Sequence, residues 1–430
     1  MIPATSFQLN NGMRFIVAED RAVPAAAFGI WTRAGVCDEP PDRRGIAHYF
    51  EHMMFRGSEN FGPKEHTRAI SRIGGRCNAF TGFDATVYHE EFPSLALERI
   101  FELEADRFMR LRLDAESAET EKKVILEEVR VYENQPIVKA FRRLVGMIGG
   151  AHPYGLDPLG RVEDVQAANL DDLIRFYRRL YRPGNVFAVV TGDVDTTQVR
   201  ALAEQHFGAW RDPADMAPPD EPPRFLPITG ARAEKLSFEV PLAVRLHRLP
   251  PSAELDHAGL ELLTALLADG ESSPVQETLV KKTRLCVHAG AKAFKMLHGG
   301  VLVFYGAFMP PGKHADRRTA LRDLCDRVAA DGPDPAEFEK RLRRFRKSRA
   351  AQQYSVHKRL LGLGEAEALE GSFRKYEQAE ADWAHVTPDR VRDLARALFA
   401  PDNTLELDVV PEKSRWWLPV AGLIMKARPR

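Results

Sequence analysis

Apolar and polar positions alternate along the first part of the chain in a way that predicts β-strands. Three consecutive runs are strand-like, at residues 6–9, 14–18 and 25–32. Apolar residues recur at helical spacing in four later segments, at residues 45–55, 64–73, 94–110 and 115–132. A strand pair is expected within 76–92. Because the early strands follow one another without intervening helices, we predict an α+β fold with a mainly antiparallel sheet covered by helices, rather than a doubly wound parallel sheet.

The second half of the chain echoes the first. The segment LYRPGN at 180–185 is followed by VFAVVTGDV, and LFAPDN at 398–403 is followed by TLELDVVPE. In each copy a helical stretch ends at a proline turn and leads into a strand-like run, and the two copies are 403 − 185 = 218 residues apart. Further strands are expected near 235–249 and 301–307. A helix, turn and strand that recur in the same order indicate a duplicated domain.

A proline-rich, acidic segment, RDPADMAPPDEPPRFLPITGAR, nearly bisects the 430 residues. It has neither helical nor strand periodicity, which is typical of a stiff, extended linker. A chain of this length is also long enough for two cores. We therefore predict a first domain over residues 1–212, a linker over 213–232 and a homologous second domain over 233–430.

The overall composition excludes some partners. Lys plus Arg and Asp plus Glu each number 61, so no net charge favours nucleic acid. The four cysteines have no paired spacing, and the first residues lack the pattern of a secretory signal, which favours the cytoplasm, with the periplasm as the alternative. The apolar run at 416–425 is too short to span a bilayer, so no integral membrane segment is expected; packing of this tail on its own domain is favoured over a docking role.

The segment IAHYFEHMM, residues 46–54, carries two histidines and a carboxylate in an apolar stretch. On a helix, His48 and His52 lie one turn apart on the same face, so both imidazoles can bind one metal ion. Glu51 lies close to the same face, where it could contact a water bound by the metal. The order H-x-x-E-H is that of inverted zinc peptidase motifs. The alternative is a core helix with two hydrogen-bonded histidines and a surface glutamate.

A catalytic zinc usually has three protein ligands, so a third must lie elsewhere. The predicted helix EKKVILEEVR provides candidates. Glu121 and Glu128 are seven residues apart and share a face, while Glu127 is rotated by about 100° from Glu128. Taken alone, the segment is equally typical of a solvated amphipathic helix.

Four motifs occur in the order found in the pitrilysin family of zinc peptidases: HYFEH, GGRCNAFTGFDATVY, the two glutamates with six residues between them, and HPYGLDPLG. The chain resembles this family strongly in its first half and weakly in its second, and it is most similar to bacterial subunits of the mitochondrial-processing-peptidase type. The family's ligand spacing, here 128 − 52 = 76 residues, selects Glu128. The resemblance implies two duplicated α+β domains that form half of a clamshell around a peptide chamber.

The resemblance also implies a role for each matching residue. His48, His52 and Glu128 would bind Zn²⁺, and Glu51 would be the general base of peptide hydrolysis. Glu121 would belong to the catalytic set, either by orienting a ligand histidine or by assisting the reaction; an exposed helix glutamate is the alternative.

The strand that contains Asn78, Ala79 and Phe80 matches the family's edge strand, which receives the peptide substrate as an added strand. Without the resemblance, this segment would be interpreted as a hairpin with Phe80 in the core. Four other residues have side chains that bind metals but do not match the family's ligand positions, and we expect them to be structural: His66, His89, Glu90 and Glu91.

The second half departs from the family where relatives hold substrate with an arginine and a tyrosine. Lys281 stands at the arginine position and Val287 at the tyrosine position, with Arg284 nearby. Lysine lacks the planar fork of arginine, and valine has no hydroxyl. We therefore predict a zinc-dependent endopeptidase of unfolded peptides that works with a related second subunit carrying the Arg/Tyr pair. A homodimer, and a non-catalytic assembly or peptide-binding subunit of the same fold, are the alternatives.

Overall fold

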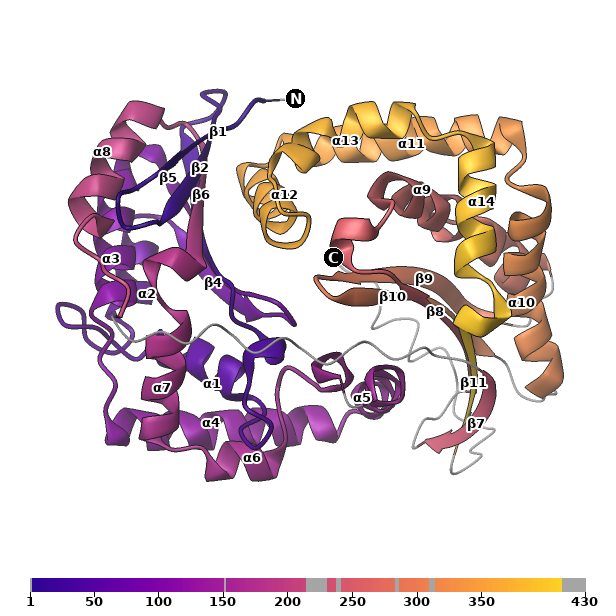
Figure 1. Ribbon diagram of the computed structural model, residues 1–430, viewed down its shortest axis with the longest axis horizontal. Helices are drawn as coiled ribbons and strands as arrows, with labels where there is room; N and C mark the ends of the chain where they lie inside the picture. The colour runs from indigo at the N-terminus through magenta and orange to yellow at the C-terminus, as the bar shows by residue number, and fades with distance from the viewer. Residues whose placement is uncertain are drawn as a thin grey trace.

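The computed structural model describes residues 2–150, 152–213, 230–236, 241–282, 286–308 and 314–411. The chain forms two mixed sheets with helices packed on them, and the two halves lie side by side (Figure 1). This confirms the predicted α+β class. Within the described ranges, no helix is both long and apolar enough to cross a membrane.

The first sheet has the strand order β1-β2-β6-β3-β5-β4. Its strands are β1 (Thr5–Gln8), β2 (Arg14–Glu19), β3 (Ala25–Thr32), β4 (Arg76–Thr81), β5 (Thr86–Pro93) and β6 (Val186–Gly192). Only β2 and β6 run parallel; the other neighbours are antiparallel. Among the described strands, β4 lies at an edge and pairs with β5 alone, so one side of its backbone has no strand partner there.

The second sheet has the order β7-β11-β8-β10-β9. Its strands are β7 (Gly230–Leu236), β8 (Leu242–Leu249), β9 (Cys286–Met296), β10 (Gly299–Phe308) and β11 (Thr404–Pro411). Strand β11 is inserted parallel to β7 and antiparallel to β8, as β6 is inserted between β2 and β3. The second half thus repeats the strand plan of the first from β2 onward.

Helices cover the sheets of both halves. Those of the first half are α1 (Ile46–Met53), α2 (Glu65–Arg72), α3 (Leu97–Met109), α4 (Ala115–Glu133), α5 (Pro136–Gly149), α6 (Val162–Ala167), α7 (Leu170–Leu180) and α8 (Thr196–Phe207). Those of the second half are α9 (His257–Ala268), α10 (His314–Asp331), α11 (Pro335–Gln353), α12 (Val356–Leu369), α13 (Arg374–Ala384) and α14 (Pro388–Leu398). The strands and helices expected in the first half are found within three residues of their predicted bounds.

Two expectations differ from the structure in detail. The strand run expected at 235–249 is divided into β7 and β8, and β9 had not been expected. Strand β7 also begins at Gly230, inside the last residues of the predicted linker. Most of the linker, 214–229, lies outside the described residues, so the domain boundaries at 212 and 233 stay predictions.

The repeated turn is built in the same way in both halves. Asn185, after α7, donates from Nδ2 to the carbonyl oxygen of Leu180 at 2.9 Å. Asn403, after α14, donates from Nδ2 to the carbonyl oxygen of Leu398 at 2.9 Å. These amides cap the helix ends and direct the chain into β6 and β11. The structure therefore gives a physical reason for the asparagine shared by LYRPGN and LFAPDN.

Each sheet is covered on one face by helices of its own half and on the other by a helix of the opposite half. Helix α12 crosses from the second half onto β3 and β6, where Leu360 packs in one apolar cluster with Trp31 and Val189 (Figure 1). In return, Ile148 of α5 packs with Val244 of β8 in the cluster on the second sheet. The two halves are joined by exchanged helices.

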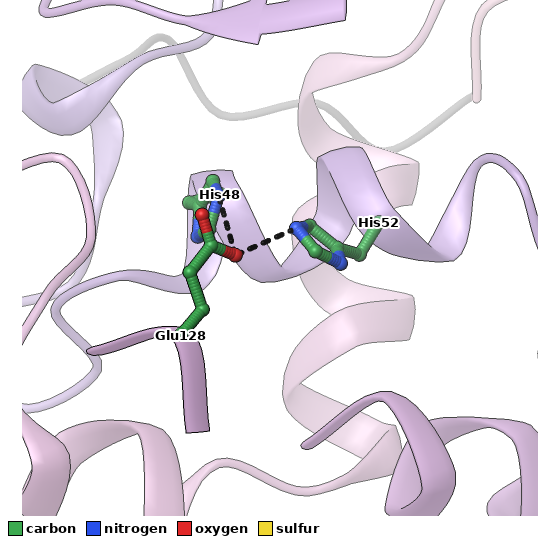
Figure 2. A group of neighbouring side chains, drawn as sticks. All are labelled: His48, His52 and Glu128. Carbon is green, nitrogen blue, oxygen red and sulfur yellow. Dashed lines mark ion pairs between the residues drawn. The ribbon is translucent and has the colours of Figure 1, made fainter. Parts of the chain in front are cut away.

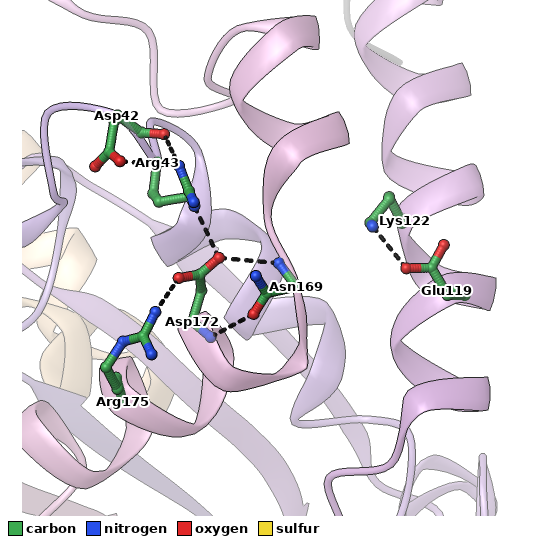
Figure 3. A network of polar contacts seen from close by, with 7 residues as sticks. All are labelled: Asp42, Arg43, Glu119, Lys122, Asn169, Asp172 and Arg175. Carbon is green, nitrogen blue, oxygen red and sulfur yellow. Dashed lines mark hydrogen bonds and ion pairs between the residues drawn. The ribbon is translucent and has the colours of Figure 1, made fainter.

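A polar network fixes the segment that precedes α1. Arg43 donates from Nε to Oδ2 of Asp172 at 2.7 Å, and Arg175 also contacts that carboxylate (Figure 3). Asp172 and Asn169 form a reciprocal capping box at the start of α7, with each backbone N–H bonded to the other side chain at 3.0 Å. The start of α1 is thereby tied to the start of α7.

Substituting Gly364 tests the packing of α12. A Cβ at this position would overlap the ring of Trp31, so helix and sheet can approach only with glycine here. We expect Gly364→Ala to lower the free energy of unfolding by about 1–3 kcal/mol, measured by urea denaturation. The neighbouring Glu365, 55% exposed at its side chain, offers the control: Glu365→Ala should change stability by less than about 0.5 kcal/mol. Equal effects of the two variants would contradict this packing.

His247 should make stability depend on pH. The residue is fully buried on β8, and burial, followed by the nearby Arg245, lowers its pKa to about 3. The unfolded chain therefore binds a proton below pH about 6.5 that the folded chain does not, so stability is lost as pH falls from that value toward 3. Between pH 7 and 5, the free energy of unfolding of the native chain should fall more steeply than that of His247→Gln, by up to about 1.4 kcal/mol per pH unit. Parallel curves for the two proteins would contradict this.

Candidate metal centre

The metal-binding motif lies on α1, a helix of only eight residues. Its start is held by Glu39, whose two carboxylate oxygens accept the backbone N–H groups of Gly45 and Ala47, each at 3.0 Å. A carboxylate at a helix N-terminus also interacts favourably with the helix dipole. Gly45 has a φ of 92°, and a Cβ there would lie 2.8 Å from Cα of Gly160, the last residue of HPYGLDPLG. The carboxylate and the close backbone contact fix where α1 begins.

His48 and His52 project from one face of α1 toward Glu128 on α4 (Figure 2). Oε2 of Glu128 lies 3.9 Å from Nε2 of His48 and 3.5 Å from Nε2 of His52. One ligand atom from each of the three residues lies within 4.8 Å of the other two. The structure thus brings together the three residues predicted to bind metal.

Glu121 lies behind His52 and is buried, with 7% exposure. Its Oε2 is 3.2 Å from Nδ1 of His52, and its Oε1 accepts a 2.9 Å ion pair from Arg56. A carboxylate on Nδ1 fixes the ring and leaves Nε2 directed at Glu128. Of the two predicted roles for Glu121, the contacts support orientation of a ligand histidine. Arg56 had not been predicted; its position one turn after His52 was the available signal.

The charges of the site are unbalanced. Burial, followed by the neighbouring His52, lowers the pKa of His48 to about 3, so its imidazole is neutral near pH 7. Burial opposes protonation of His52, but Glu121, Glu128 and Glu51 outweigh it and raise its pKa. When both histidines are taken as neutral, the carboxylates of Glu51, Glu121 and Glu128 and the guanidinium of Arg56 together give a formal charge of −2.

These donors fit a zinc ion. Two imidazole nitrogens and one carboxylate oxygen are a common set for catalytic zinc, and ligands about 2.0–2.2 Å from a tetrahedral metal lie about 3.4 Å from one another. The Glu128 oxygen lies 3.5 and 3.9 Å from the two imidazole nitrogens, close to that separation. A divalent cation would also compensate the negative charge of the site.

Glu51 connects the metal site to the edge strand. Its Oε2 accepts a hydrogen bond from Oγ1 of Thr81, at the end of β4, at 2.5 Å. Burial raises the pKa of Glu51, so this carboxyl holds a proton more readily than an exposed glutamate does. Thr81 is a contact that the sequence interpretation had not assigned.

The predicted substrate residues lie on β4, directly beside α1. Asn78 is exposed, Ala79 is half-buried, and Phe80 is 46% exposed. Phe80 is therefore not the core residue that the motif alone would indicate. The strand combines a free backbone edge with side chains open to solvent, which is what an added peptide strand requires. Their contact with substrate stays a prediction.

Two of the four residues expected to be structural, His66 and Glu90, lie in a buried cluster with Glu104 that has the spacing of a metal site. However, Arg107 lies between the two carboxylates, 3.2 Å from Glu90 and 2.5 Å from Glu104, and Nε2 of His66 is 2.6 Å from Glu104. The guanidinium already supplies the positive charge that a cation would bring. This cluster is an internal ion-pair network.

The other two face the opposite side of the first sheet. Nδ1 of His89 is 3.0 Å from Nε2 of His357 on α12, and Glu91 forms a 2.7 Å ion pair with Arg76. Neither residue approaches the metal site.

The structure places two of the second-half residues at which the chain departs from the family resemblance, Lys281 and Val287. Lys281 lies in a π-helical turn, Gln276–Lys282, and forms a 2.9 Å ion pair with Glu277. Val287 lies on β9 and brings no hydroxyl group. Arg284 lies outside the described residues.

Two family models match most of the chain. The Insulinase (Peptidase family M16) domain matches residues 14–149, and the Peptidase M16 inactive domain matches residues 167–345. The zinc protease PqqE of Helicobacter pylori is 27% identical over 340 residues, which is 78% of this chain and 77% of the relative. YmxG of Bacillus subtilis, an uncharacterized zinc protease, is 25% identical over 405 residues, which is 93% of this chain and 97% of the relative.

Solved structures show the same fold. A protease from Helicobacter pylori superposes with a TM-score of 0.90 at 23% identity, over 96% of this chain and 100% of that one. The ferredoxin protease FusC, in complex with Arabidopsis ferredoxin, gives a TM-score of 0.74 at 18% identity, over 99% of this chain and 49% of that one. Special closeness to mitochondrial-processing-peptidase subunits stays a prediction. The domain matches, the zinc-protease relatives and the shared fold show that the chain belongs to the M16 family of peptidases, the pitrilysin or insulinase family.

Proposed function

We propose that the chain is a zinc-dependent endopeptidase that hydrolyses unfolded peptides or small polypeptides within a closed chamber. One observation carries the proposal. His48, His52 and Glu128 converge on one point, and Glu51 from the same helix lies between that point and a free sheet edge. A chain that kept the fold for assembly alone would not need this combination.

Each residue of the site has a separable task. His48, His52 and Glu128 would hold the zinc ion, while Glu121 and Arg56 fix the ring of His52. When bound, zinc supplies Lewis acidity, which makes water a stronger acid and polarises a carbonyl group. Glu51 takes the proton of the attacking water and later donates it to the leaving amine. Thr81 holds the carboxylate of Glu51 in place between these two steps.

Strand β4 explains why the substrate would be extended. A peptide that pairs with the free edge of β4 must expose its backbone over several residues, which a folded segment cannot do. Backbone pairing also places few demands on sequence, and Asn78, Ala79 and Phe80 would border the bond to be cleaved. FusC, which shares the fold of the present chain, is seen in complex with a protein, ferredoxin. This complex supports a polypeptide substrate for the present chain.

We also propose that a related second chain completes the chamber. The lysine and valine at positions 281 and 287 lack the bidentate fork and the hydroxyl with which relatives hold substrate. A partner that carries the arginine and tyrosine would supply both groups. A homodimer in which Lys281 or Arg284 suffices is the alternative. The proposed domains are 1–212 and 233–430.

The free state of the cysteine thiols supports a reducing compartment. Cys37, Cys77, Cys286 and Cys325 are all free, and two of them are buried. We propose the cytoplasm, where thiols stay reduced. The periplasmic location of the structural neighbour PqqL from Escherichia coli supports the alternative.

Replacing Glu128 should release the metal. We expect Glu128→Gln to lower zinc affinity by about tenfold to 100-fold or more, because a neutral amide replaces the anionic ligand. Zinc content after gel filtration and competition with a chelating dye are the measurements. The adjacent Glu127, 67% exposed and paired with Arg130, provides the matched control, since Glu127→Gln removes the same charge from the other face of α4. Equal zinc affinity in the two variants would remove Glu128 from the ligand set.

Replacing Glu51 should stop hydrolysis without removing the metal. We expect Glu51→Gln to lower kcat on a quenched-fluorescence peptide by about 10²–10⁴-fold, the usual contribution of a general base, with zinc content unchanged.

The native chain should be assayed alone and mixed with a related chain that carries the Arg/Tyr pair. Cleavage by Glu51→Gln at the native rate would rule out the proposed base. A native chain that binds zinc but cleaves nothing in either assay would favour a non-catalytic assembly or peptide-binding subunit. Full activity of the chain alone would remove the need for a heterologous partner.

A further inference from the structure

The turn between β9 and β10 is held by two side chains of the first half. Asp84 accepts the backbone N–H of Leu297 on Oδ2 at 3.0 Å, and the hydroxyl oxygen of Tyr154 accepts the backbone N–H of His298 at 2.9 Å. The Tyr154 hydroxyl also donates to Oδ1 of Asp84 at 2.6 Å. Two consecutive amides of the second half are thus bound by one carboxylate and one hydroxyl that are themselves hydrogen-bonded.

These amides need partners outside their own hairpin. Met296 pairs with Gly299, so Leu297 and His298 are the two central residues of the turn, and their N–H groups have no place in the ladder between β9 and β10. Tyr154, at 3% exposure, is buried at this junction, where a donor or acceptor left without a partner would be costly.

Asp84 belongs to the tip of the β4–β5 hairpin, and the opposite side of this tip is also fixed. The N–H groups of Val36 and Cys37 donate to the carbonyl oxygens of Gly82 and Phe83 at 3.2 and 3.0 Å. A Cβ on Gly35 would lie 2.5 Å from the Phe83 carbonyl oxygen, so the two backbones are in contact. The tip is therefore held between the segment that leads into α1 and the turn of the second half.

The same hairpin carries the free edge of the first sheet. Asp84 is the third residue after Thr81, which ends β4 and hydrogen-bonds the carboxylate of Glu51. A shift of the tip would therefore move the strand on which an extended peptide is proposed to pair.

We propose that Asp84 and Tyr154 are positioning residues that lock the edge strand β4 to the second half of the chain and so set the place where a peptide strand is received. This proposal gives the HPYG motif a structural role, because its tyrosine is one of the two residues that bind the turn of the second half. For catalysis, this inference rests on the proposed peptidase function. The contact of Asp84 and Tyr154 with the turn between β9 and β10, which is the lock itself, can be tested without substrate.

Hydrogen exchange tests the lock. Tyr154→Phe keeps the ring, which packs 5.4 Å from Phe83, and removes only the hydroxyl; Asp84→Asn keeps the size and removes the charge. In each variant, amides at Leu297 and His298 and along 76–81 should exchange about tenfold faster than in the native chain, as loss of a hydrogen bond to a charged group predicts. The double variant should be little worse than either single one, because the two residues act as a unit.

Peptide cleavage gives the functional readout. With zinc content unchanged, KM should rise about fivefold to tenfold and kcat should change less, because the strand that receives the peptide is loosened while the metal site is intact. Tyr305→Phe is the control: it removes a hydroxyl 3.3 Å from His288 on the same second-half sheet and should alter neither exchange at these sites nor KM.

Unchanged exchange at 297, 298 and 76–81 in both variants would overturn the lock. Faster exchange with unchanged KM would overturn its role in receiving peptide. If the native chain cleaves nothing either alone or mixed with a related chain that carries the Arg/Tyr pair, the proposed function fails, while the exchange measurements still decide whether the lock exists.

Discussion

Both faces of the central strands of each sheet are buried, and each half of the chain supplies cover for only one of them. Strands β2, β3 and β6 are buried along almost their whole length, so they cannot present one face to water. Helix α12 covers the remaining face of the first sheet, and helix α5 covers the remaining face of the second. Burying these faces fixes the two halves relative to each other, and the remaining features of the molecule follow from that arrangement.

The candidate metal site depends on this framework because α1 has little stability of its own. A helix of two turns is marginal in water and takes its position from what surrounds it. Here Glu39 holds its N-terminus, Arg43 ties the preceding segment to α7, and α4 brings Glu128 against its polar face. The three candidate ligands are therefore positioned by contacts with the surrounding protein.

Much of the fold, and the grouping of the three candidate ligands, could be predicted from the sequence. Periodicity located the strands and helices of the first half, the repeated LYRPGN pattern indicated the duplication, and the i, i+4 histidines identified the site. His48 and His52 form a local pattern that can be recognised in the sequence. Glu128 could be selected only through the resemblance to a family, because the sequence of a solvated helix does not show which of its glutamates lies near a distant histidine.

The residues that escaped prediction share one physical reason: their roles come from contacts between segments far apart in sequence. Arg56 and Thr81 gain their roles from Glu121 and Glu51, and neither residue is unusual in its own segment. The exchange of α5 and α12 was also not foreseen. The continuous apolar run VFAVV in β6 was the signal for burial on both faces, but it does not say which helix provides the second cover.

The exchange of α5 and α12 has the same form as an exchange of elements between two protomers. If the chain were cut between the halves, each would give one helix to the other and receive the equivalent helix in return, which is the arrangement of a domain-swapped dimer. The segment between the halves then acts as a tether that holds two protomers at high effective concentration. In these terms, a single chain is a covalently joined pair of domains, and the proposed chamber of two chains would contain four of them.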